Sequence, residues 1–228
     1  MGFLDELKKQ ADALASQQRI DEAAFERNAL LTDAACKTVF QYWLELARQL
    51  NLLRPPVPSR YVLDKQHQLD GPAEGLRFDD FRVDARRKRM RNLEVYDHVV
   101  ATCWVRGGRS MTLAKNFPPD MERLEARLTQ AGIVAVPDAQ RDLNTGKFRE
   151  ARYHFEAEVR VGVRLLPDHE QGRVQFAASN LEGLSTLVVE FAAVAVNTAL
   201  LDELSKWWLG EPNGFVSAGR IVKIVDPR

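Results

Sequence analysis

The stretch ARYHFEAEVRVGVRLL, residues 151–166, alternates apolar and mostly charged side chains over its whole length. Successive side chains of a β-strand point to opposite faces of a sheet, so the alternation predicts a long strand with one buried and one polar face. A turn at 167–170 leads into a second alternating stretch at 173–178. That loop would set Val163 opposite Val174, apolar against apolar. We therefore expect an antiparallel hairpin.

Two further alternating segments precede this hairpin. The segment at 76–85 slips in phase at Asp79 and Asp80, which indicates a β-bulge. The segment at 93–105 is followed by a Gly-Gly pair, which predicts a tight turn into a paired strand at 110–115. Tight turns join antiparallel strands, because parallel strands need crossover connections of about a dozen residues. The sheet is therefore expected to be mostly antiparallel.

Two segments earlier in the chain have helical patterns. Residues 1–53 carry apolar side chains at helical spacing, with a predicted break at Asp21 and a firm stop at the prolines after residue 54. Residues 118–131 begin with two prolines and end before Gly132, as helices commonly do. The first segment is expected to pack against the apolar face of the sheet.

A third helix is predicted at 180–209, because Ser179 and Glu182 match a capping box. Within it, residues 184–201 carry one charge and several polar groups, and a membrane span needs about 20 predominantly apolar residues. Because this helix is apolar nearly all round, the N-terminal helices or a second subunit must cover its outer side. The candidate interface residues are Val189, Val196, Leu200, Trp207 and Trp208.

These elements predict an α+β fold, a mostly antiparallel β-sheet of about 6–8 strands packed against long N-terminal and C-terminal helices. The chain divides into an N-terminal helical segment, 1–53, and a sheet-containing segment, 59–228, and we expect one domain overall. Its 228 residues, of which 45% are hydrophobic, suffice for one sizeable core.

Charge and cysteine content narrow the class of protein. The 32 basic and 32 acidic residues balance, which excludes a globally basic nucleic-acid binder. Cys36 and Cys103 are far apart in the sequence, so neither a disulfide framework nor a thiolate zinc site is expected. The first residues lack the pattern of a signal peptide. We expect a cytoplasmic protein without a membrane span.

One basic cluster stands out from this balanced composition. Its cations could contact nucleic-acid phosphates, an anionic lipid surface or an acidic partner segment. No aromatic residue lies inside the run, and a solvated loop balanced by neighbouring carboxylates is the simpler explanation. The candidate residues for an anionic partner are Arg82, Arg86, Arg87, Lys88, Arg89 and Arg91.

Polar residues on two strands are candidates for a pocket. His98 and Trp104 share an outer face that is unusually apolar, which indicates either a covered central strand or a pocket with one polar anchor. His154, Glu156 and Glu158 share one strand face and could act as acid, base or ligand, although a solvated polar face explains them too. No histidine lies in a zinc-binding motif, so no metal and no cofactor is expected.

The sequence contains no recognisable catalytic constellation, which disfavours an enzyme. We therefore expect a non-enzymatic interaction or assembly protein that forms a homodimer. One alternative is a carrier or enzyme for an apolar small molecule, with a cavity between the sheet and the C-terminal helix. The other is binding of nucleic acid or another anionic partner through residues 86–91.

Overall fold

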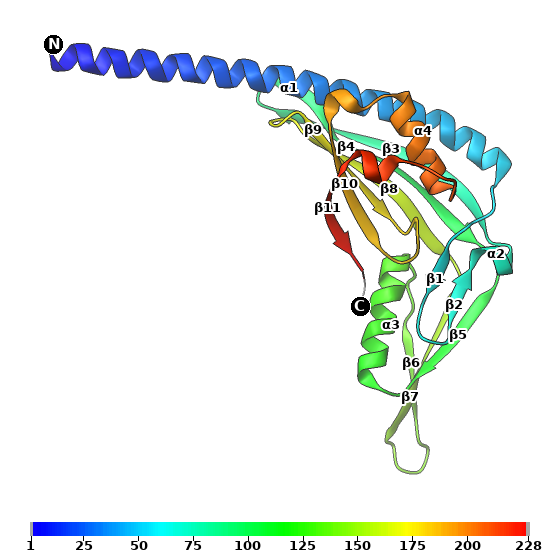
Figure 1. Ribbon diagram of the computed structural model, residues 1–228. Helices are drawn as coiled ribbons and strands as arrows, with labels where there is room; N and C mark the ends of the chain where they lie inside the picture. The colour runs from blue at the N-terminus through cyan, green and yellow to red at the C-terminus, as the bar shows by residue number, and fades with distance from the viewer. Residues whose placement is uncertain (1, 227–228) are drawn as a thin grey trace.

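Antiparallel sheets and one very long helix make up the protein, which is α+β as the sequence predicts (Figure 1). The computed structural model describes residues 2–226. Within this range the strands form sheets of six, three and two strands. In chain order the elements are α1 (Phe3–Leu53), β1 (Arg60–Val62), β2 (Gln68–Asp70), α2 (Gly71–Glu74), β3 (Arg77–Met90), β4 (Leu93–Arg106), β5 (Ser110–Lys115), α3 (Pro118–Ala131), β6 (Pro137–Arg141), β7 (Phe148–Glu156), β8 (Val159–Asp168), β9 (Arg173–Ser179), β10 (Thr186–Ala192), η1 (Ala193–Ala195), α4 (Thr198–Trp208), α5 (Phe215–Ala218) and β11 (Arg220–Val225).

The six-stranded sheet has the order β11-β10-β9-β8-β4-β3, and each neighbouring pair is antiparallel. One face of this sheet is apolar and lies beneath α1, α4 and α5 (Figure 1). Aromatic rings fill the space between this face and the helices. The ring centroids of Trp43 in α1 and Phe176 lie 6.4 Å apart, edge to face. Trp208 of α4 lies 5.7 Å from Phe81. Phe215 of α5 meets Phe176 at 5.4 Å, so the sheet and three helices share one core.

Helix α1 is continuous, and the break predicted at Asp21 is wrong. No glycine or proline interrupts the segment after residue 2, and the Asp21 carboxylate accepts a hydrogen bond from the Gln17 amide one turn earlier instead of capping a new helix. Side chains at helical spacing from Phe25 to Leu50 are buried against the sheet. The helix ends at Leu53, and Arg54 after it adopts a left-handed conformation before the prolines.

Polar contacts hold α1 on the sheet. Its Thr32 hydroxyl lies 2.6 Å from Nδ1 of His169, a residue of the loop between β8 and β9 that is only 2% exposed. The Nε2–H of His169 donates to the backbone carbonyl of Tyr96 at 2.7 Å. One buried imidazole therefore joins α1, β4 and the β8–β9 loop, because both of its nitrogens find partners.

The chain leaves the six-stranded sheet after β4 and returns to it at β8. Between these points it builds α3 and the three-stranded sheet β5-β7-β6 (Figure 1). Helix α3 has the bounds that the sequence predicts, and it buries Leu124 and Leu128. The Tyr153 hydroxyl of β7 donates to the Glu125 carboxylate of α3 at 2.7 Å, which ties the helix to this smaller sheet.

The predicted pairing of 93–105 with 110–115 is wrong. Both edges of β4 are occupied, by β3 on one side and β8 on the other. Strand β5 instead pairs with β7, and Ser110 lies opposite Glu156. The Gly-Gly pair therefore connects one sheet to the other. The partner of β5 could not be predicted locally, because β7 and β8 lie far along the sequence.

The opening stretch 151–166 is also two strands instead of one. It divides at 157–158, so β7 and β8 belong to different sheets although the alternation continues through the junction. The hairpin of β8 with β9 is confirmed, with Val163 opposite Ala178 instead of Val174. The register differs because the loop occupies 169–172, beginning with the buried His169.

The helix predicted over 180–209 is wrong in its first half. Ser179 ends β9, and Asn180 and Gly183 adopt positive φ angles of 62° and 100°, which turn the chain back into β10. Apolar residues cover both faces of this segment, so periodicity cannot distinguish a buried strand from a buried helix. The C-terminal helix is α4, which begins after Asn197, whose side chain caps its first turn.

The two edges of the large sheet differ in composition. Edge strand β3 carries a charged residue at most positions. Edge strand β11 instead exposes four apolar side chains, and its pairing with β10 shifts between Val188 and Val189, so that Val222 has no partner. The exposed apolar side chains of β11 are Ile221, Val222, Ile224 and Val225.

Candidate functional site

The face of the six-stranded sheet that points away from α1 is largely uncovered. Along β8, Val161 and Val163 point to the core, and Arg160, Gly162 and Arg164 lie on the opposite face. Neighbouring strands alternate in the same way, and α3 approaches this second face at one end (Figure 1). We call this uncovered side the open face.

Small side chains form the floor of the open face. A Cβ at Gly162 would lie 2.7 Å from the carbonyl oxygen of Ala101 and 2.8 Å from the Thr102 methyl, so only glycine fits here. No side chain therefore rises above the backbone at the centre of the floor. The other floor residues are neighbours across the adjacent strands β4, β9 and β10. They are Val100, Ala177, Ser179, Thr186 and Val188.

A groove of about 570 Å³ lies between this floor and α3. Gln130 of α3 donates hydrogen bonds to the side chains of Asn180 and Thr186, at 3.0 and 3.1 Å. The Asn180 amide donates in return to the backbone carbonyls of Gln130 and Arg160. This network fixes α3 against the sheet at one end of the groove. The groove has the size of a small-molecule site, roughly 300–1,000 Å³.

The charged side chains that line this groove are two arginines. Arg160 and Arg164 are both exposed, and they stand on either side of Gly162. Within residues 2–226 neither guanidinium has a hydrogen-bond or ion-pair partner, and the groove lining includes no carboxylate. Two unneutralised cations above a floor of small and hydroxyl-bearing side chains attract anionic groups.

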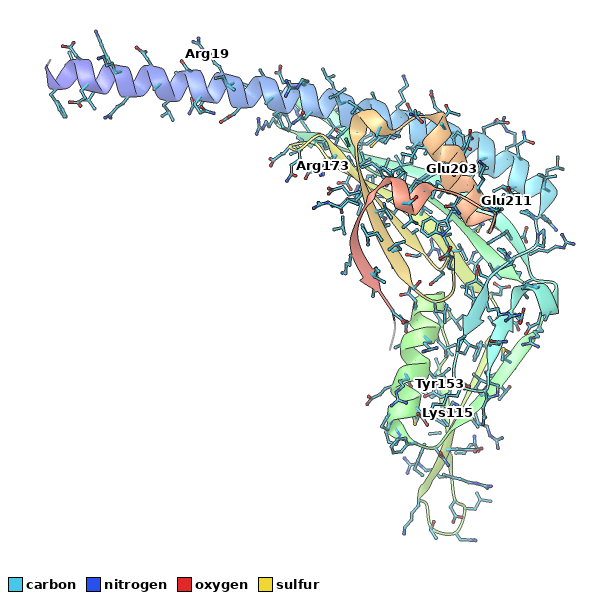
Figure 2. The ribbon with its side chains drawn as sticks, in the orientation of Figure 1. Arg19, Lys115, Tyr153, Arg173, Glu203 and Glu211 are labelled. Atoms are coloured by element: carbon cyan, nitrogen blue, oxygen red, sulfur yellow. The ribbon has the colours of Figure 1, made fainter. Side chains whose placement is uncertain are left out.

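Arginines at the far side of the open face are neutralised. Glu190 is 7% exposed, and it accepts hydrogen bonds from Arg173 and Arg220, both at 2.7 Å, and from Gln175 at 3.1 Å. The hydrogen bond from Gln175, together with the two arginines, holds the pKa of Glu190 below its ordinary value. Figure 2 labels Arg173 at the start of β9. Arg173 and Arg220 are therefore neutralised, whereas Arg160 and Arg164 at the groove are not.

A second cleft, of about 480 Å³, lies between the β1–β2 hairpin, β5 and α3. Two of its four basic side chains are paired with carboxylates, since Lys115 lies 2.7 Å from Asp64 and Arg123 lies 3.1 Å from Asp120. Arg127 donates to the backbone carbonyl of Val62 at 2.7 Å, and Lys65 has no partner within residues 2–226. Burial alone would raise the pKa of Asp64, but Lys115 and backbone N–H donors hold it well below its ordinary value. The lining of this cleft contains two carboxylates and that of the groove contains none, so the groove is the stronger candidate for binding an anion.

The predicted basic cluster spans a register shift between Arg86 and Arg87, where Asp97 of the neighbouring strand β4 is an extra, unpaired residue. Arg87 lies 3.4 Å from Asp33 of α1. Arg91 stands over the ring of Phe25, also in α1, at 3.9 Å from the ring centroid. Two cations of the run therefore hold the long helix on the sheet and are not directed at a partner molecule.

The other cations of the cluster point in different directions. Arg82 and Lys88 form ion pairs with neighbouring carboxylates, at 2.9 and 3.1 Å. Arg86 and Arg89 have no side-chain partner within residues 2–226, and Arg86 lies on the open face next to β4. Three of the six cations are paired with carboxylates, so the cluster does not form one continuous free patch.

His98 and Trp104 lie on the open face but not in the lining of the groove. Nδ1 of His98 lies 3.0 Å from the Asp97 carboxylate. The Arg106 guanidinium stands over the Trp104 ring, 5.6 Å from its centroid. Trp104 is opposite Arg160 in the β4–β8 ladder, so it borders one end of the groove.

The structure does not bring His154, Glu156 and Glu158 together as a site. His154 and Glu156 lie on β7, in the three-stranded sheet, and bond to hydroxyl groups of β5 at 2.9 and 3.0 Å. Glu158 lies in the connection to β8 and pairs with Arg106 at 3.1 Å. Each side chain already has its own partner, as expected for a polar sheet face.

The predicted interface residues lie in the protein's own core. Trp207 and Trp208 are 5% and 1% exposed. Trp207 donates from its indole nitrogen to the Glu182 carboxylate at 2.6 Å and stacks on Phe215. These rings occupy the space between sheet and C-terminal helix that was expected to hold an apolar cavity, and a second subunit has no access to them. The remaining candidates are buried or half-buried: Val189, Val196 and Leu200.

Arg160 and Arg164 are absent from the residues singled out by the sequence analysis. Both belong to the alternating stretch that predicts the central hairpin, on its charged face, and the available signal was Gly162 between them. A glycine in the middle of a strand often marks a close approach of backbone or ligand. The groove itself could not be foreseen, because α3 reaches it from a distant part of the chain.

Other kinds of site find no support in residues 2–226. No three side chains among His, Cys, Asp and Glu are grouped to hold a metal ion. No helix in this range combines the length and apolar character needed to cross a membrane. No protein-family model, curated protein or solved structure matches the chain, so its functional assignment rests on the groove and its two arginines.

Proposed function

We propose that this protein is a binding protein that takes a small oxyanionic ligand, carrying phosphate or carboxylate groups, in the groove between the open face and α3. The observation that supports it is the pair of unpartnered guanidinium groups in a lining without a carboxylate. The sequence predicts an interaction protein, and we propose that its partner is an anion. It also moves the contact from residues 86–91 to Arg160 and Arg164.

The arrangement of donors suits a ligand with two anionic ends. Arg160 and Arg164 are four residues apart on one strand, which separates their Cα atoms by about 13 Å. Each guanidinium is a planar fork that bonds two oxygens of a carboxylate or phosphate at once. Gly162 leaves room between them, and the Ser179 hydroxyl, 3.0 Å from the Thr186 hydroxyl, adds a neutral polar group on the floor. A diphosphate or a dicarboxylate would be held at both ends.

Calorimetric titration of the full chain with pyrophosphate, and separately with citrate, tests the proposal and distinguishes the two chemistries. We expect one site whose affinity falls with added salt, because part of the attraction is electrostatic. Arg160→Gln with Arg164→Gln should weaken binding at least tenfold, since hydrogen bonds to charged groups contribute about 1.5–3 kcal/mol each.

Arg149→Gln is the matched control, because Arg149 is another exposed arginine without a side-chain partner in residues 2–226 but lies on β7. It should bind both anions as the parent protein does. Equal losses in the control and the groove variant would show nonspecific charge attraction and contradict the proposal. So would binding of a labelled single-stranded oligonucleotide that survives the groove substitutions while pyrophosphate and citrate fail to bind.

A cytoplasmic location is part of this proposal. Cys36 and Cys103 are free, buried thiols, as is usual in reducing compartments. Burial raises the pKa of Cys36 to about 12, so this thiol stays protonated and unreactive.

A further inference from the structure

The first turns of α1 extend beyond the rest of the molecule. Every side chain from residue 2 to residue 23 is exposed, and Phe25 is the first buried residue of the helix. Figure 1 shows this segment projecting from the sheet, and Figure 2 shows its side chains, Arg19 among them, surrounded by no other element. We call residues 3–23 the arm.

The arm carries an apolar stripe with coiled-coil spacing. Leu4, Leu7, Ala11 and Leu14 are separated by three, four and three residues, the a–d–a–d pattern of heptads. In the isolated chain Leu4 and Leu14 are 68% and 61% exposed. A seam of leucines at this spacing is the surface that a facing helix covers in a coiled coil.

The positions beside the stripe are compatible with a second, identical stripe. One flank consists of Phe3, Gln10 and Gln17, and the other begins with Lys8 and Ala15. Flanking residues with charges of one sign would make two copies repel each other. Of these five flanking residues only Lys8 is charged, so such repulsion is small. The other charged residues of the first three turns point away from the stripe: Asp5, Glu6, Lys9 and Asp12.

We propose that two copies of this protein associate by antiparallel pairing of their arms. Leu4 of one copy then meets Leu14 of the other, and Leu7 meets Ala11, so one two-fold axis satisfies all four stripe positions. The overlap covers residues 3–15, about 20 Å of helix at 1.5 Å per residue. Such a contact is at the small end of stable interfaces, so the dimer dissociates on dilution.

The antiparallel direction follows from what lies further along the helix. The next stripe positions are Gln18 and Asp21. Parallel pairing in register would set Asp21 against its own copy in the seam and bring both sheets to the same end. Antiparallel pairing leaves both residues beyond the overlap, places the sheets at opposite ends, and aligns the two helix dipoles favourably.

Sedimentation equilibrium of the full chain over a wide concentration range tests this pairing. The parent protein should shift from 25.9 kDa toward twice that mass as its concentration rises. Leu7→Gln with Leu14→Gln should remain monomeric over the same range. Ile20→Gln is the matched control, because Ile20 is equally exposed on the arm but lies outside the stripe, and it should associate like the parent. A parent protein that stays monomeric overturns the proposal.

Cysteine cross-linking tests the direction. Leu4→Cys and Leu14→Cys chains should form few disulfide dimers alone and many when mixed, because antiparallel pairing joins position 4 to position 14. Each variant cross-linking with itself would instead show parallel arms and overturn the antiparallel arrangement. The native Cys36 and Cys103 are buried and do not compete. Circular dichroism of each variant confirms that the fold is kept.

Discussion

The side chain of Asn51 shows how one amide can set the shape of a strand. Its Nδ2 donates to the backbone carbonyl of Phe81 at 2.9 Å, and its Oδ1 accepts from the Phe81 N–H at 2.7 Å. The bulge between Asp79 and Arg82 removes these two backbone groups from the β3–β4 ladder. Asn51 replaces the lost partners, so the bulge that the phase slip predicts is stabilised from α1.

Asn51→Ala should lower the free energy of unfolding by about 1–3 kcal/mol, because a half-buried donor and acceptor lose their partners. Urea denaturation monitored by tryptophan fluorescence measures the change. Gln49→Ala is the control, since the Gln49 amide bonds only to Glu45 on the exposed side of the same helix. Its effect should stay within about 0.5 kcal/mol. Equal effects of the two substitutions would contradict the role given to Asn51.

Asp64 makes the stability of the β1–β2 hairpin dependent on pH. Its carboxylate accepts from Lys115 and from the backbone N–H groups of Gln66 and His67, and its pKa is depressed below the ordinary value of 3.8. A depressed pKa contributes stability that is present above the unfolded-state value and is lost as the pH falls through the folded one.

We therefore expect Asp64→Asn to destabilise the protein at pH 7 by about 1 kcal/mol or more. The difference from the parent should persist down to about pH 4 and then shrink, because the Asp64 carboxylate takes up a proton first in the unfolded parent chain. Denaturation midpoints at several pH values measure this. Glu122→Gln, an exposed carboxylate on α3, is the control and should show no such convergence. A difference that stays constant from pH 7 to pH 3 would refute the assignment.

Helices with local end signals could be predicted from the sequence, and elements defined by distant partners could not. Helix α3 has its predicted bounds because its prolines and Gly132 act within one turn of its ends. Strand β10 was mistaken for helix because burial on one face and partial cover on the other removes the alternation that marks a strand. The turn at Asn180 and Gly183 was the local evidence against a helix there.

The candidate site was less predictable than the fold. The basic run at 86–91 is conspicuous in the sequence, yet ion pairs and α1 use most of its charge. Arg160 and Arg164 are inconspicuous, because they continue the row of mostly charged residues at alternate positions that begins at residue 152. Their importance depends on which acids lie nearby and on where α3 ends, and both are properties of tertiary structure.

The molecule is much longer than its mass implies. Helix α1 has 51 residues and is about 76 Å long at 1.5 Å per residue. A compact chain of 228 residues has a radius of gyration of about 17 Å, which corresponds to a far shorter maximum dimension. Small-angle X-ray scattering of the monomeric Leu7→Gln, Leu14→Gln variant should therefore give a maximum dimension of at least about 76 Å. A value near 50 Å would mean that the arm folds back onto the sheet.

The unequal edges of the large sheet bear on how the protein avoids aggregation. Strand β3 repels a foreign strand with its charges, whereas β11 offers a row of β-branched side chains, the composition that favours amyloid-like stacking. The unpaired Val222 interrupts that row, because a bulge twists an edge and spoils its fit to a flat partner. One irregular residue thus makes an apolar edge a poorer template for a foreign strand.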